Sequence, residues 1–230
     1  DFAQVTVNGE DMGIYVHVEP VKPAFLRTHF GNDDGDLYEG TLSDFHPLKT
    51  QTFQSKTDET DASLAPIHAL TEALEARDAP LIEILEDHID LDQYLSFWAM
   101  ETMIGHWDGY NGFNTNNFFV YRSPDTERFR FIPWGIDGIF FPEAFEGEAD
   151  PEEEGSLIPS SSALASAILR SDDLSERYYD RLAELMDAHW DERALIAEID
   201  RMENLIASAI DVSDIEGEIE RIRDYVRGFA

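Results

Sequence analysis

Two short runs of β-branched and aromatic residues, both following a Gly- and Asn-rich loop, constrain the fold of this chain most strongly. The runs cover residues 118–121 and 129–134 and have the composition of neighbouring strands. The loop before them carries Asp108, Asn117 directly precedes the first run, and Asp137 follows the second. This order predicts that two strands bring three metal-competent or proton-accepting side chains together.

The same order of residues is found in the catalytic centre of protein kinases. There, a loop Asp accepts the proton of the attacking hydroxyl, while an Asn and a second Asp bind the magnesium that bridges the phosphates. The standard kinase signature spaces its loop Asp and Asn more closely than Asp108 and Asn117, and it has Phe after the second Asp. Here Gly138 and Ile139 follow Asp137. The match is therefore one of order and context.

Residues 106–110, 114–118 and 133–137 together resemble the CotH kinase family, whose members carry His-x-Asp-Gly-(Tyr/Trp), Asn-x-Asn-Asn-(Tyr/Phe) and Pro-Trp-x-x-Asp segments. Upstream, residues 7–19 are similar to the family's Asn-Gly-x-x-x-Gly-x-Tyr hairpin, and residues 25–38 to its Phe-Leu and Gly-x-Leu-Tyr stretch. The resemblance covers roughly residues 1–141 in the same order, which makes it fairly specific.

The resemblance implies an α+β fold with an atypical protein-kinase-like core, and transfer of the ATP γ-phosphate to a Ser or Thr hydroxyl of a protein, with the chain itself among the candidate substrates. Asp108 is then the catalytic residue, and Asn117 and Asp137 bind Mg²⁺. Glu19 is the candidate cofactor-binding residue, by analogy with the kinase Glu that pairs with a phosphate-positioning lysine. His106 is expected to orient or pack.

Two features depart from the family pattern. Many members have Pro-Trp-Asp-x-Asp where this chain has Gly135, so one acidic position is absent. The family's upstream segment, with the basic residues that would hold the ATP phosphates, has no counterpart before Asp1. We therefore expect a single CotH-like domain over residues 1–230 that is N-terminally incomplete.

Each candidate residue also has a structural interpretation. Asp before Gly is a common turn signal, which applies to Asp108. The Asn residues between 111 and 117 can stabilise an irregular loop through hydrogen bonds to the backbone, and Asp137 can cap the following turn. The alternative function is a catalytically inactive surface or assembly module. A metal-dependent hydrolase is a weaker third class, because the sequence contains no His-Glu-x-x-His pattern.

The charge of the chain limits its partners. With 49 acidic and 16 basic residues the net charge is -33, which argues against nucleic acid and anionic membranes as partners. Such a surface is typical of halophilic proteins, and a calcium-rich extracellular setting is the second explanation. No run of about eighteen apolar residues predicts a membrane span. The chain has no cysteine, so localisation at the cell surface or outside the cell follows only from the resemblance.

Hydrophobic periodicity divides the chain into four parts. Residues 1–61 should contain a β-hairpin with its turn at Asn8-Gly9, a helix over residues 23–30 closed by Gly31, and then loop. Residues 62–141 should contain helices interrupted at Pro80, the last ending near Ile104, and then the catalytic segment. Residues 142–159 read as an acidic loop, and residues 160–230 as a helical C-terminal lobe.

Overall fold

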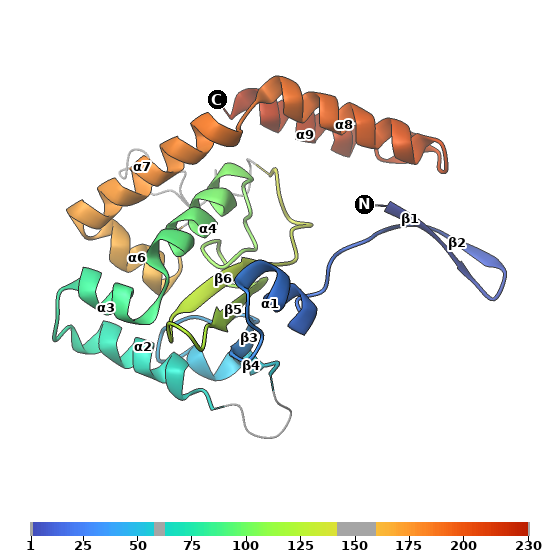
Figure 1. Ribbon diagram of the computed structural model, residues 1–230. Coiled ribbons are helices and arrows are strands. Elements are labelled where there is room, and N and C mark those ends of the chain that lie inside the picture. Colours follow the sequence, from blue (N-terminus) through green and yellow to red (C-terminus); the bar gives the residue numbers. More distant parts are fainter. Residues whose placement is uncertain (1, 58–62, 142–159, 230) are drawn as a thin grey trace. The chain divides into compact units, whose positions relative to one another are not determined.

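The computed structural model describes residues 2–57, 63–141 and 160–229, and they form an α+β protein with small antiparallel sheets (Figure 1). The chain divides into two compact units, Asp1–Asp33 with His189–Ala230, and Asp34–Ala188. A single domain over all 230 residues thus stays a prediction. The predicted acidic loop at 142–159 lies outside the described residues. No helix in the described part of the chain is long and apolar enough to span a membrane.

The N-terminal part of the first unit is a β-hairpin followed by a short helix. Strands β1 (Phe2–Val7) and β2 (Glu10–Val16) pair around Asn8 and Gly9, whose φ angles of 54° and 86° suit a tight two-residue turn. Helix α1 (Pro23–Phe30) ends at Gly31 with φ 79°. The hairpin with its turn at Asn8-Gly9 and this helix were both predicted.

The remainder of the first unit is helical, as the apolar spacing predicted. It contains α8 (Glu192–Ala207), the short 3-10 helix η2 (Val212–Asp214) and α9 (Glu216–Gly228). Arg223 of α9 forms ion pairs with Asp200 and Glu203 of α8, and these ion pairs connect the two helices.

The second unit is built on a four-stranded antiparallel sheet with the order β4-β3-β5-β6. Its strands are β3 (Asp36–Gly40), β4 (Gln54–Ser55), β5 (Phe118–Arg122) and β6 (Phe129–Pro133), and the 3-10 helix η1 (Thr50–Thr52) precedes β4. The sequence predicted β5 and β6 but not β3, which pairs along its whole length with β5.

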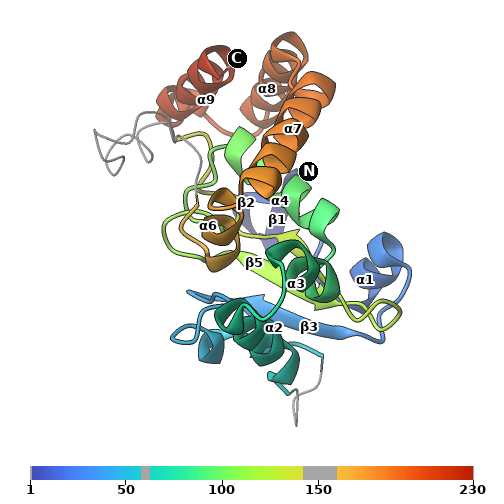
Figure 2. The ribbon, with the colours of Figure 1, turned by 90° about the vertical axis from the view of Figure 1, so that its left-hand side faces the viewer.

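In the described residues of this unit, helices lie beside and above the sheet in Figure 1, and Figure 2 shows α2, α3, α6 and α7 from the side that faces the viewer. These helices are α2 (Ala65–Ala76), α3 (Leu81–His88), α4 (Leu91–Met103), α6 (Ala163–Leu169) and α7 (Asp172–His189). The predicted interruption at Pro80 separates α2 from α3, because proline fixes the residue before α3 in an extended conformation.

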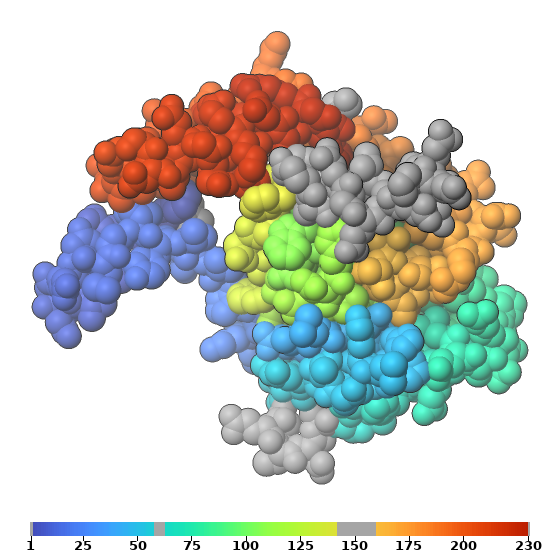
Figure 3. All heavy atoms as spheres, turned by 180° about the vertical axis from the view of Figure 1, so that it is seen from behind, coloured from blue at the N-terminus to red at the C-terminus, as the bar shows by residue number. Residues whose placement is uncertain are grey.

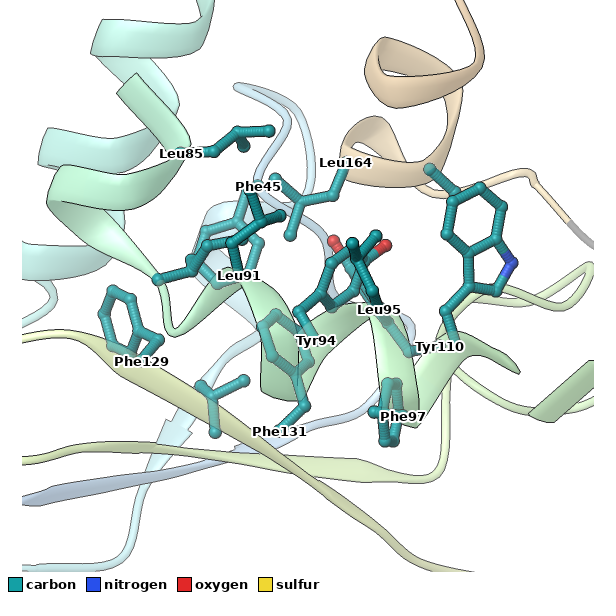
Figure 4. Close-up of a cluster of buried hydrophobic side chains, with 14 of the residues drawn as sticks. Phe45, Leu85, Leu91, Tyr94, Leu95, Phe97, Tyr110, Phe129, Phe131 and Leu164 are labelled. Carbon is teal, nitrogen blue, oxygen red and sulfur yellow. The ribbon is translucent and has the colours of Figure 1, made fainter. Parts of the chain in front are cut away.

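Helix α4 lies in the middle of the core and contacts both the sheet and α7. Tyr94 and Phe97 pack on Phe131 of β6, with ring centroids 4.7 and 5.4 Å apart, and Figure 4 shows these rings together. On another face of α4, Trp98 stacks on Tyr178 of α7 at 3.7 Å. All of these side chains are buried. The end of α4 is therefore a rigid place from which to start a functional loop.

Candidate functional site

The loop from Gly105 to Asn117 begins where α4 ends and is folded by its own backbone. Gly105 has φ 58°, which reverses the chain after the helix. Inside the loop the Gly109 N–H donates to His106 O, and the Phe113 and Asn116 N–H groups donate to Trp107 O and Gly109 O. These bonds hold the loop in one conformation without regular secondary structure.

Asp108 is the centre of a cluster of amide side chains. Its Oδ1 accepts a hydrogen bond from Asn114 Nδ2 at 2.9 Å, and its Oδ2 accepts one from Asn117 Nδ2 at 2.7 Å. Asn116 Nδ2 adds a longer contact of 3.4 Å to Oδ2. The donors are neutral, so they orient the carboxylate without cancelling its charge. The structure thus brings together Asp108 and Asn117, the residues that the sequence placed at the catalytic and metal positions.

Asn117 itself has an unusual backbone and an available oxygen. Its φ of 51° lies in the left-handed region, which Asn tolerates better than most residues and which is often found at functional sites. Its Nδ2 faces Asp108, and in the described chain no side-chain or backbone group donates to its Oδ1. An amide oxygen in this state can serve as a metal ligand.

The segment after β6 packs on the Asp108 loop at several points. The Trp134 N–H donates to Asn117 O at 3.1 Å, and the Phe140 N–H donates to Ile104 O at 2.8 Å. A Cβ atom added to Gly138 would lie 2.9 Å from the indole nitrogen of Trp107. Asp137 therefore belongs to a segment that is fixed to the loop on both of its sides.

The Asp137 side chain is exposed and makes no hydrogen bond or ion pair within the described residues. It does not cap the following turn. Magnesium takes one or two protein oxygens and completes its shell with water and phosphate oxygens. The free Asn117 Oδ1 and the free Asp137 carboxylate fit that requirement. No group of three or more His, Asp or Glu residues suited to a metal ion occurs in the part of the chain described here.

Gly135, where many family members have Asp, lies directly against Asn117. A Cβ on Gly135 would be 2.6 Å from both Cγ and Oδ1 of Asn117, closer than side-chain atoms approach one another. Its φ of 55° also disfavours any residue with a side chain. An acid at this position would need Asn117 to move, so in this chain the glycine is what lets the loop after β6 approach the Asn117 amide.

We expect Gly135→Ala to destabilise the protein by about 1–3 kcal/mol, through the left-handed backbone and the contact with Asn117. Urea unfolding of the parent protein, Gly135→Ala, Asn117→Gly and the double variant forms a double-mutant cycle that measures the contact. Asn117→Gly removes the side-chain atoms that the new Cβ would meet. The cost of Gly135→Ala should fall in the Asn117→Gly background. Equal costs in both backgrounds would show that the two residues do not contact each other.

A buried carboxylate that the sequence analysis did not single out supports the loop from below. Glu101, in the last turn of α4, is only 2% exposed and accepts hydrogen bonds from the backbone N–H groups of Tyr110 and Asn111 and from Asn111 Nδ2. His106 is fully buried beside it, with Nδ1 3.6 Å from Glu101 Oε1, and neither ring nitrogen forms a hydrogen bond with the described residues. An acid within an apolar helical run was the only sequence signal for Glu101.

A second buried carboxylate extends this support to α6. Asp44 accepts hydrogen bonds from the Tyr110 hydroxyl at 2.9 Å and from the Ala163 backbone N–H. Burial raises the pKa of Asp44, and these hydrogen bonds oppose the rise. The Tyr110 side chain thus ties the Asp108 loop to the start of α6.

Glu19, the predicted cofactor-binding residue, belongs to the first unit. Its carboxylate lies 3.1 Å from His29 Nε2 of α1, and both side chains are exposed. No lysine of the described residues forms an ion pair with Glu19. The role of Glu19 in nucleotide binding stays a prediction.

Comparison with known proteins identifies the family. The family model described as CotH kinase protein matches residues 1–226. The chain belongs to the CotH kinase family. It is also 26% identical over 152 residues to the inner spore coat protein H of Bacillus subtilis (strain 168), an alignment covering 61% of this chain and 41% of that protein. The CotH match reaches beyond residue 141, the limit of the motif resemblance, into the C-terminal helices.

Proposed function

We propose that this CotH-family chain has an atypical kinase-like core and is an ATP-dependent protein kinase that transfers the γ-phosphate to a Ser or Thr hydroxyl. The observation that supports this most is the arrangement around Asn117. One end of its amide orients Asp108, its other end is free, and the segment that carries Asp137 packs against it. These contacts support a site in which a proton acceptor and two metal-competent oxygens act together.

In this proposal, Asp108 orients the substrate hydroxyl and accepts its proton, because its carboxylate is held by amide donors that leave its charge intact. Asn117 Oδ1 and Asp137 would hold Mg²⁺, which when bound neutralises charge on the ATP phosphates. Positioning and preorganised charge supply most of the acceleration, since phosphoryl transfer requires little covalent help from the protein.

The test is transfer of label from γ-labelled ATP, with magnesium and with a chelator, to the protein itself and to a generic Ser/Thr acceptor. The full natural protein that carries these residues is the appropriate sample, because the aligned region spans less than half of the related coat protein. Label transfer that needs magnesium supports the proposal. If the folded protein neither binds Mg–ATP nor transfers label to itself or to the acceptor, the proposal is wrong.

The Asp137→Asn variant tests the metal role. It should raise the magnesium concentration needed for half-maximal transfer by about tenfold or more, since a carboxylate ligand becomes a neutral amide. Asp125→Asn, at an exposed position of the turn between β5 and β6, is the matched control and should leave the magnesium dependence unchanged. An equal response of the two variants would remove Asp137 from the metal site.

Gly135 favours a second candidate, a catalytically inactive binding module. The acid found there in many family members is missing, and the contact with Asn117 leaves no space for it. In this case the chain would act in the assembly of a surface or coat. The name of the related coat protein suggests a coat or surface location for this chain, whether it is a kinase or a binding module. Mg–ATP binding without transfer, or no nucleotide binding at all, is the result expected of such a module.

A further inference from the structure

The second unit contains a cavity apart from the Asp108 site. It has a volume of about 810 Å³, within the range of ligand pockets, and its lining includes neither Asp108 nor Asn117 nor Asp137. Its walls come from the segment 44–47, the end of α2 and the connection to the start of α3, and α6 with the residues that flank it. Figure 3 shows the light-blue segment around residue 45 next to the orange α6 and the teal helices on one face of this unit.

Two arginines, Arg77 and Arg170, line this cavity and have no ion pair in the described chain. That is unusual here, because carboxylates greatly outnumber basic residues and most arginines are paired. The paired arginines are Arg27, Arg122, Arg130, Arg177, Arg181, Arg201, Arg221, Arg223 and Arg227. Two guanidinium groups that form no ion pair with a carboxylate of the described residues therefore line one cavity.

The acidic side chains that line the cavity do not form ion pairs with these arginines. Asp44 is buried and engaged by Tyr110 and Ala163, and Glu75 has no ion pair with either arginine in the described residues. The rest of the wall combines apolar side chains, among them Leu74, Leu81 and Ile84, with His46 and serines. A ligand that fits has an anionic group for the arginines and apolar groups beside it.

We infer that this cavity binds a phosphorylated Ser or Thr side chain within a peptide. Arginine binds phosphate through pairs of parallel hydrogen bonds, and arginine clusters are the recurring means of phosphopeptide recognition. The apolar wall receives the residues next to the phosphorylated one. The choice of phosphoserine over another anion rests on the proposed kinase function. The cavity would then bind the product of that reaction in the same unit of the protein as Asp108.

Binding of a labelled peptide that contains one phosphoserine between leucine and alanine residues tests this inference by fluorescence anisotropy, without ATP or magnesium. We expect the phosphopeptide to bind at least tenfold more tightly than its unphosphorylated twin. Arg77→Gln and Arg170→Gln should each weaken binding by about tenfold or more, because each removes a charged hydrogen-bond donor. Arg128→Gln, an exposed arginine that also lacks an ion pair and lies outside the cavity, is the matched control and should bind normally.

Several results would overturn the inference. The first is equal binding of the phosphorylated and unphosphorylated peptides, and the second is an equal loss of peptide binding in Arg128→Gln and in the cavity variants. The third is equal binding of a peptide in which glutamate replaces phosphoserine. The fourth is displacement of the labelled peptide by inorganic phosphate at the same concentration as by unlabelled phosphopeptide. The last result would assign the cavity to free phosphate. Because the assay needs no catalysis, a protein that transfers label but fails to bind the phosphopeptide loses only this inference. A protein that binds the phosphopeptide without transferring label loses only the kinase proposal.

Discussion

Replacing Asp108 with Asn should lower the rate of phosphoryl transfer by about 10²- to 10⁴-fold while ATP binding is kept. The amide cannot accept the proton of the substrate hydroxyl. It also presents a donor to Asn114 and Asn117, which are donors themselves, so the hydrogen bonds that orient residue 108 are weakened. Steady-state transfer from γ-labelled ATP measures the rate, and nucleotide binding is measured separately.

Asp125→Asn is the control for this prediction, as the same substitution at an exposed turn position. A circular-dichroism spectrum unchanged from that of the parent protein separates loss of chemistry from loss of structure. If Asp108→Asn keeps full activity, Asp108 is a turn-forming residue, as the Asp-Gly sequence alone permits. If ATP binding disappears together with activity, Asp108 acts on the nucleotide and not on the hydroxyl.

The sequence was sufficient for elements whose information is local. Asn8-Gly9 fixes a hairpin through the turn it requires, and Pro80 marks the start of α3, because proline is tolerated before the first turn of a helix but not in its interior. Strands β5 and β6 were recognisable because their residues are almost all apolar or aromatic. In each case the signal lies within a few neighbouring residues.

Strand β3 could not be predicted in the same way. Of its five residues only Leu37 and Tyr38 are apolar, and glycines lie before and at the end of the strand. What defines β3 is pairing with β5, where a Cβ on Gly40 would lie 2.2 Å from the Phe118 ring. The requirement for glycine there comes from a residue far away in the sequence, and no local pattern contains it.

The candidate site shows the same division. The order of Asp108, Asn117 and Asp137 along the chain predicted a shared region, and the hydrogen bond between Asp108 and Asn117 confirms that the first two are in contact. The contact of Gly135 with Asn117 was not predictable, since it depends on the path of the chain after β6. The support from Glu101 was also missed, because its partners are nine and ten residues further along in an irregular loop.

Removing Glu101 should have the largest effect on stability of any single carboxylate in the loop region. Glu101→Ala leaves the Tyr110 and Asn111 backbone N–H groups and Asn111 Nδ2 without their acceptor in a buried region, and leaves a cavity beside His106. We expect a loss of about 3–5 kcal/mol in the free energy of unfolding. Urea unfolding followed by tryptophan fluorescence measures it, because Trp98 lies in the same helix as Glu101 and is fully buried.

Two further variants give this prediction its control and its mechanism. Glu72→Ala changes an exposed glutamate in the middle of α2 and should alter stability by no more than about 0.5 kcal/mol. Glu101→Gln keeps the size of the side chain and one acceptor oxygen, but its amide nitrogen must face a donor, because both Glu101 oxygens accept hydrogen bonds. Its cost should therefore lie between those of the two alanine variants. A Glu101→Gln protein as stable as the parent would show that the size of the side chain, and not acceptance at both oxygens, holds the Asp108 loop in place.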